Sequence, residues 1–243
     1  TRDVRIARSA RAIHGDQEAQ PPVEASRMLL VGDVDYGAGS AMSALPATGM
    51  EVDTIAQTMA RVGFTPQLLR GTAADEADVR AAAGGRRILH FATHGFFDPV
   101  SAGEAAPLWR AGIALSGANE AGEDHMAADD GVLYAAEVTA WPLSGVDLVV
   151  LSACDTAQGD RSYVEGLSGL PSALAVAGAK RSLLARWPVS DRGKALFMIR
   201  FYQALAMTRS YEQAIRLAKL DAIAGKLPGV QDDVWLAFAM IAN

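Results

Sequence analysis

Two short apolar runs constrain the fold of this chain more than any other feature. Residues 88–93 (Ile-Leu-His-Phe-Ala-Thr) and 146–153 (Val-Asp-Leu-Val-Val-Leu-Ser-Ala) each have the length and composition of a buried β-strand. His94 follows the first run, and Cys154, the only cysteine of the chain, follows the second. Because parallel strands of an open sheet present their ligands at their carboxyl ends, we expect both residues at that edge.

The rest of the chain alternates predicted strands with predicted helices. Strands are expected at 28–31, 65–70, 112–116 and 180–186, and helices at 48–62, 74–83, 166–177, 192–207 and 210–224. Residues 234–241 are predicted to be a last strand in preference to a short helix. This alternation predicts an α/β fold with a mostly parallel sheet and helices on both faces.

The domain organisation follows from a change in composition near residue 27. Residues 1–26 are polar, Arg-rich and contain Pro21-Pro22, which predicts a linker or the tail of an upstream module. Residues 27–243 then form the folded domain. The chain begins at Thr1 without an initiator Met, so we expect it to be a piece of a longer protein.

Composition excludes several classes of function. The net charge of −6 disfavours direct nucleic-acid binding or an anionic membrane as the partner. No apolar stretch reaches the ~20 residues that span a bilayer. A single cysteine allows no internal disulfide, which indicates the cytoplasm. The sequence lacks metal-ligand spacing, a G-x-S-x-G elbow and, in the glycine-rich stretch 32–39, the G-x-G-x-x-G spacing of a dinucleotide site, so no cofactor is expected.

Cys154 and a nearby histidine suit thiol nucleophilic catalysis, because an imidazole can take the thiol proton. A cysteine after a buried strand can equally be a small core residue. Cys154, however, lies one position beyond the apolar run and precedes Asp155-Thr156, which favours a turn at the surface.

Of the four histidines, His94 is the best partner for this cysteine. His90 lies inside its strand and is expected to be structural, whereas His94 precedes Gly95, which permits tight backbone curvature. No role is assigned to His14 or His125.

Several linked motifs resemble the CHAT domain family. His-Phe-Ala-Thr-His-Gly at 90–95 and Leu-Ser-Ala-Cys-Asp-Thr at 151–156 are similar to its two signature blocks. Residues 165–170, 177–179 and 186–191 match later blocks, and 45–48, Glu51 and Trp235 are similar to further family features. The resemblance covers roughly residues 27–242.

The resemblance implies a caspase-like sheet from the caspase–separase–gingipain clan of cysteine peptidases. It implies His94 and Cys154 as a catalytic dyad, with the N–H groups of Gly95 and Cys154 as the oxyanion hole. CHAT domains commonly follow tetratricopeptide repeats in bacterial proteins, so the expected partners are a protein substrate and an upstream repeat domain or regulatory protein.

The residues that would bind the substrate side chain before the cut bond, P1, depart from known patterns. Where caspases have a glutamine and relatives that cut after Arg or Lys often have an aspartate, this chain has Ser152. Asp155, Arg186 and Asp191 are the other candidates for lining that pocket. Two like charges ~4 Å apart repel by about 4 kcal/mol at an effective dielectric of ~20, so a basic or neutral P1 residue is favoured over Asp.

The sequence therefore predicts a cysteine endopeptidase that cleaves a dedicated protein. The alternative is a catalytically silent CHAT module that serves as a docking or signalling scaffold. A third expectation is gating, because the polar loops 117–130 and 156–164 are long enough to need ordering by a partner or an upstream domain.

Overall fold

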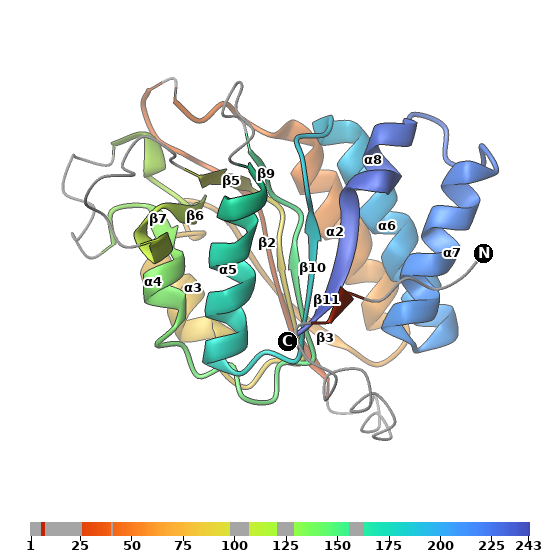
Figure 1. Cartoon of the computed structure of the whole chain (residues 1–243), viewed down its shortest axis with the longest axis horizontal. Coiled ribbons are helices and arrows are strands. Elements are labelled where there is room, and N and C mark those ends of the chain that lie inside the picture. The colour runs from red at the N-terminus through yellow and green to blue at the C-terminus, as the bar shows by residue number, and fades with distance from the viewer. Residues whose placement is uncertain (1–5, 8–25, 40, 98–106, 121–128, 156–162) are drawn as a thin grey trace.

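A computed structural model describes residues 6–7, 26–39, 41–97, 107–120, 129–155 and 163–243. Among these residues the strands form one sheet of seven strands and a second of four. Helices cover both faces of the larger sheet (Figure 1), which confirms the predicted α/β class. None of the helices in the described part of the chain is long and apolar enough to cross a membrane.

The larger sheet has its most buried strands in the centre. Its order is β1 (Ile6–Ala7), β11 (Phe238–Ala242), β10 (Arg181–Ala185), β8 (Leu148–Leu151), β4 (Ile88–Phe91), β2 (Arg27–Val34) and β3 (Thr65–Gly71). Neighbouring strands are parallel except for the antiparallel pair β10 and β11. Every residue of β4 and β8 is buried, as expected for parallel strands that are covered on both faces.

Each face of this sheet has its own layer of helices. The first layer contains α2 (Pro46–Ala60), α6 (Asp191–Thr208), α7 (Tyr211–Ile223) and α8 (Asp232–Ala237). The second contains α3 (Glu76–Ala83), α4 (Ala135–Val138) and α5 (Tyr163–Ala177) (Figure 1). Alternate strand residues enter the two cores, with Leu30 and Val150 on the first side and Leu29 and Val149 on the second.

The smaller sheet was only partly predicted. Its order is β7 (Val132–Tyr134), β6 (Ala111–Ala114), β5 (His94–Phe97) and β9 (Cys154–Asp155). Two 3-10 turns, η3 (Pro107–Trp109) and η4 (Ala118–Glu120), flank β6. Of these strands the sequence predicted only the one near 112–116. The short strands β5 and β9 continue β4 and β8 after a break of two residues each.

Both ends of the chain differ from the prediction in detail. Residues 234–241 are not one strand: α8 comes first, with Asp232 and Asp233 in its first turn, and β11 follows as the antiparallel neighbour of β10. At the other end, Ile6 and Ala7 pair with Ile241 and Ala242, so two residues of the predicted linker lie on the sheet edge. The domain boundary at residue 27 stays a prediction.

A buried polar cluster joins the first helix layer to the sheet. Glu51 on α2, His90 on β4 and Tyr202 on α6 are all fully buried. His90 Nε2 lies 3.0 Å from Glu51 Oε1, and the Tyr202 hydroxyl lies 3.2 Å from His90 Nδ1. Burial raises the pKa of Tyr202 well above its ordinary value, so its hydroxyl stays protonated. His90 is thus a satisfied structural histidine, and its cluster fixes the spacing of α2 and α6.

Removing the Tyr202 hydroxyl leaves the buried His90 Nδ1 without a partner. We therefore expect Tyr202→Phe to lower the free energy of unfolding by about 1–3 kcal/mol, measured by urea denaturation. Tyr211→Phe is the matched control. It removes a hydroxyl whose partner, Arg87, still donates hydrogen bonds to Asp147 and Ser26. A loss no larger for Tyr202→Phe than for Tyr211→Phe would contradict the structural role of the cluster.

Candidate active site

The site is built by two strand pairs that share one register. In the larger sheet, β4 pairs with β8 so that each residue is opposite the one 60 positions later, from Ile88 with Leu148 to Phe91 with Leu151. In the smaller sheet, His94 pairs with Cys154 with the same offset. The chain therefore leaves β4 and β8 at the same level and keeps its register in β5 and β9. As a result, His94 and Cys154 are neighbours on adjacent strands. Adjacent strands lie about 4.8 Å apart.

His94 is held by a backbone carbonyl. His94 is 1% exposed as a residue, and its Nε2 lies 2.7 Å from the carbonyl oxygen of Ser43. Because a carbonyl only accepts, Nε2 carries a hydrogen and donates it, so in the neutral ring Nδ1 is left as the acceptor. The Tyr36 ring packs against the imidazole, with ring centroids 5.1 Å apart and a 51° tilt.

Burial lowers the pKa of His94 below its ordinary value of 6.5. The Lys194 ammonium lowers it as well, whereas the Ser43 carbonyl and the Asp191 carboxylate raise it. Desolvation is the largest of these effects, since burial penalises the charged imidazolium. At neutral pH the ring is therefore neutral and able to accept a proton.

The segment that carries Tyr36 and Ser43 is fixed from several sides. Burial raises the pKa of Tyr36 to about 12, and its hydroxyl donates to Thr93 Oγ1 over 2.9 Å, since the Thr93 proton goes to the Ala114 carbonyl. Asn119 accepts from the Met42 N–H at 2.7 Å and donates to the Met42 carbonyl at 3.0 Å. Asn119 belongs to the loop that the sequence predicted as 117–130, whose residues 121–128 lie outside the described part.

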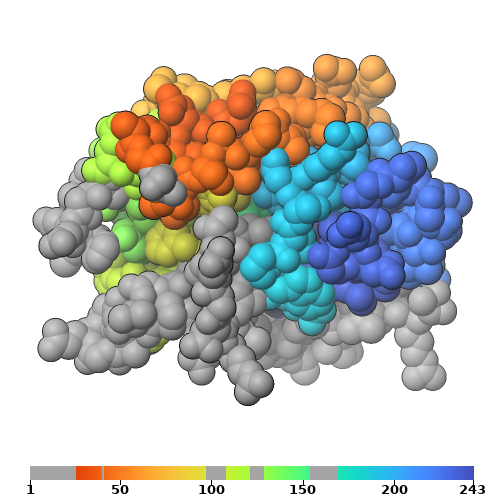
Figure 2. Space-filling view, turned by 90° about the horizontal axis from the view of Figure 1, so that it is seen from above, coloured from red at the N-terminus to blue at the C-terminus, as the bar shows by residue number. Residues whose placement is uncertain are grey.

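Asp191 lies at the other end of this segment. Its Oδ2 accepts from the Ala47 N–H at 2.9 Å, and its Oδ1 lies 3.9 Å from Nζ of the buried Lys194. Figure 2 shows the molecule from the side of the carboxyl ends of the strands, where the red-to-orange segment after β2 and the cyan segment after β10 both reach the surface. The contacts with Ala47 and Lys194 show that the Asp191 carboxylate faces the start of α2 and the Lys194 ammonium.

The backbone of Cys154 and Asp155 is described, and their side chains lie outside the described part of the structure. Gly95 pairs with Asp155 on one side and with Ile113 on the other. A Cβ at Gly95 would lie 3.2 Å from the Ala153 Cβ, so a larger residue there would make Ala153 shift by a few tenths of an ångström. The oxyanion-hole role of the Gly95 and Cys154 N–H groups stays a prediction.

Ser152 and Arg186 are not brought toward His94 by described contacts. Ser152 is fully buried, and its Oγ has no hydrogen-bond partner among the described residues. The Arg186 guanidinium donates to the carbonyls of Leu236 and Ala237 and stacks on Trp187, 4.9 Å from its ring centroid. Arg186 thus stabilises the C-terminal end of α8, which it reaches from the end of β10.

The sequence reasoning missed four residues around the imidazole: Tyr36, Ser43, Thr93 and Lys194. Tyr36 lies in the glycine-rich stretch 32–39, where no residue pattern marks a side chain that reaches a histidine. Ser43 acts through its carbonyl, which any residue has, so no side-chain pattern marks it. Lys194 is a lysine inside an amphipathic helix and gave no signal of burial.

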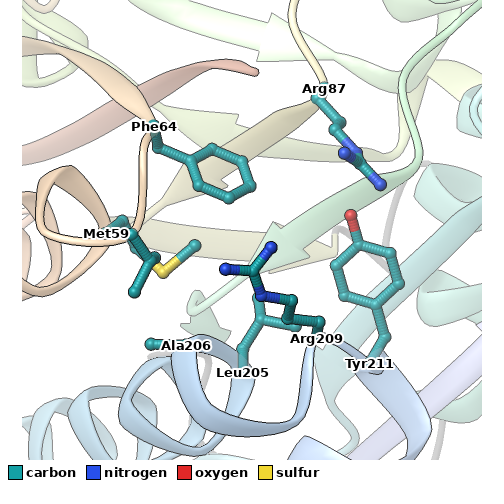
Figure 3. A pocket seen from close by; sticks show the side chains of 8 residues that line it. Met59, Phe64, Arg87, Leu205, Ala206, Arg209 and Tyr211 are labelled. Carbon is teal, nitrogen blue, oxygen red and sulfur yellow. The ribbon is translucent and has the colours of Figure 1, made fainter. Parts of the chain in front are cut away.

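A separate pocket lies near the amino ends of the strands, away from His94. Apolar side chains from the ends of α2 and α6 line it, together with Phe64, Tyr211, Arg87 and Arg209. In Figure 3 the Arg209 side chain extends between Met59 and Tyr211. Within the described residues, no group of three His, Cys, Asp or Glu side chains is arranged to hold a metal ion.

The fold is similar to that of cysteine proteinases of known structure. A structure of the Arg-specific cysteine proteinase gingipain R has 9% sequence identity and a TM-score of 0.51, over 91% of this chain and 47% of that one. A complex of gingipain pro- and mature domains from Porphyromonas gingivalis has 10% identity and a TM-score of 0.54, over 91% and 48%. A third structure, described as a protease, has 12% identity and a TM-score of 0.54, over 92% and 48%.

The family is shown by sequence. A family model described as the CHAT domain matches residues 1–243, so the chain belongs to the CHAT family, as predicted. The chain spans about half the length of the gingipain structures, and the likeness to them shows the fold alone. A search among curated proteins finds no match.

The environment of His94 predicts its titration. Its pKa lies below 6.5, so the neutral ring persists at a pH where an exposed histidine is already half protonated. We expect a histidine-selective NMR titration to give His94 an acid-shifted midpoint and an Nε2–H tautomer. His14 in the same spectrum is the internal comparison. A His94 midpoint at or above 6.5 would contradict this environment.

Proposed function

We propose that this chain is a cysteine endopeptidase with His94 and Cys154 as its catalytic pair. The observation that carries the proposal is the shared register of β4–β8 and β5–β9, which makes the two residues neighbours at the carboxyl edge of the sheet. The CHAT family and the caspase-like fold support the same class of chemistry.

In this mechanism His94 Nδ1 takes the proton of the Cys154 thiol, and the sulfur attacks the scissile carbonyl carbon. The N–H groups of Gly95 and Cys154 hold the resulting oxyanion. Collapse of the intermediate breaks the C–N bond, the imidazolium gives its proton to the leaving amine, and water then hydrolyses the thioester. Donation of Nε2–H to Ser43 favours this scheme, because it leaves Nδ1 free to act as the base.

Removing either partner should abolish cleavage without unfolding the protein. For Cys154→Ala and His94→Ala we expect cleavage of a fluorogenic peptide library, in the presence of the upstream part of the protein, to fall by at least about a thousandfold. His14→Ala is the matched control. A peptidyl thiol-reactive probe should label Cys154 in the parent, and His94→Ala should prevent that labelling. Undiminished cleavage by Cys154→Ala would reject the catalytic role.

The second candidate function is a silent CHAT module that acts as a docking or signalling scaffold. The observation that favours it is burial: the His94 side chain is 1% exposed, and Ser152, the predicted pocket residue, is 0% exposed. A peptidase must open this site before a peptide can reach the imidazole. Absence of probe labelling in the intact, partner-bound protein would favour the scaffold.

The same burial supports regulation by an upstream repeat domain or a partner protein. The described flank of the 117–130 loop is already anchored, because the Gly131 N–H donates to the buried Glu76 Oε1 at 2.8 Å. Under this proposal the 243-residue chain is weakly active alone, and the full protein responds to a stimulus in the cytoplasm.

The substrate pocket should disfavour an acidic P1 residue. Ser152, Asp155 and Asp191 provide no cation, and Arg186, the one predicted residue that could hold an aspartate, is occupied at the end of α8. We expect an unbiased peptide-library profile to show basic or neutral P1 residues, with Asp suppressed by roughly a thousandfold where an acid faces the pocket. Efficient cleavage after Asp, abolished by Arg186→Ala, would show instead that the pocket prefers an acidic P1 residue.

A further inference from the structure

The first turn of α2 lacks a cap of its own. Its N-cap residue is Leu45, which makes no side-chain hydrogen bond, and the first turn contains no acidic residue. The first N–H groups of a helix have no partner inside it and must be satisfied from elsewhere. The Thr48 N–H donates to the Leu45 carbonyl. The Ala47 N–H needs an acceptor from outside the helix.

Asp191 supplies that acceptor from 144 positions along the chain. Its Oδ2 lies 2.9 Å from the Ala47 nitrogen, where an anion also interacts favourably with the helix dipole. Asp191 is the first residue of α6, and Ser190 fixes that helix end by accepting from the Gly193 N–H. The contact therefore joins the starts of α2 and α6 at the carboxyl edge of the sheet.

The turn that this contact anchors is the one that orients His94. Only three residues separate Ser43, whose carbonyl accepts from His94 Nε2, from Ala47. At its other end the same stretch is held by Asn119 at Met42. The Ser43 carbonyl thus lies between two side-chain anchors, of which Asp191 is the charged one.

The second oxygen of Asp191 has an unusual environment for a surface cap. Oδ1 is buried without a hydrogen-bond partner among the described residues, and Lys194 Nζ lies 3.9 Å away on a side chain that is 2% exposed. Leaving a carboxylate and an ammonium in such a place is expensive unless their charges offset each other. The Lys194 ammonium therefore offsets the charge of the Asp191 carboxylate near the imidazole.

We propose that Asp191 is a positioning residue for His94, which acts by fixing the 43–47 turn so that the Ser43 carbonyl holds the imidazole. The inference rests on the catalytic role proposed for His94. It gives Asp191 a role other than lining the substrate pocket. The charged groups that face His94 are Asp191 and Lys194 from α6, and Tyr36 faces it as a neutral phenol.

Two substitutions separate the hydrogen bond from the charge. Asp191→Ala removes both, and we expect the Nε2–H tautomer preference of His94 to be lost, its pKa to fall further, and kcat to drop on the order of a hundredfold with little change in KM. Asp191→Asn keeps an oxygen acceptor for Ala47, so we expect the tautomer to be kept and kcat to stay within about tenfold of the parent. In this variant the pKa of His94 still falls, because the anion is gone.

The control is Asp75→Ala, which removes the comparable carboxylate cap of α3 at the Asp78 N–H. It should leave the tautomer and the pKa of His94 unchanged. An unchanged His94 tautomer and pKa in Asp191→Ala would overturn the proposal, and so would an Asp191→Asn variant that loses the tautomer as fully as Asp191→Ala. The NMR measurements need no turnover, so they stand even where Cys154→Ala shows that the peptidase proposal is wrong.

Discussion

The site depends on one constraint, the common register of two neighbouring strands through a break. β4 and β8 are parallel, fully buried and flanked by β2 and β10, so neither can slide by one residue without turning its apolar side chains to the wrong core. That register is maintained after Ala92-Thr93 and Ser152-Ala153, where the chain crosses to the smaller sheet. The apolar core thus fixes the relative place of His94 and Cys154.

A second constraint keeps the helices in place above this edge. The contacts between α2 and α6 include two polar links: the buried cluster of Glu51, His90 and Tyr202, and the Asp191 carboxylate at the start of both helices. Polar groups at such depth are tolerated because hydrogen bonds satisfy most of their atoms. Their directionality gives what apolar packing does not, namely one fixed spacing and rotation of the two helices.

The sequence predicted the features that depend on local pattern. The apolar runs, the alternation of strands and helices, and the place of His94 and Cys154 after strand ends could all be recognised in this way. The contacts of Asn119 with Met42 and of Asp191 with Ala47 could not be recognised. Each joins segments far apart in the chain, and no periodic pattern in the sequence marks it. The Ser43 carbonyl could not be predicted either, since backbone atoms carry no residue identity. Arg186 was predicted as the last residue of its strand, which ends one residue earlier, at Ala185. Alternation gave no direction for its side chain, which turns to α8.

Burial has two linked consequences for His94. The desolvation that hides the imidazole from solvent is also the main cause of its lowered pKa, so restricted access and a neutral ring have one physical origin. A rearrangement that exposed the ring to a peptide would weaken that desolvation and let the pKa rise toward its ordinary 6.5, which strengthens the ring as a base. The Ser43 carbonyl and the Asp191 carboxylate act in the same direction and would then be the larger influences. Under the proposed function, opening the site would therefore admit a peptide and raise the pKa of the base in a single step, provided that the 43–47 turn stays bonded to the start of α6.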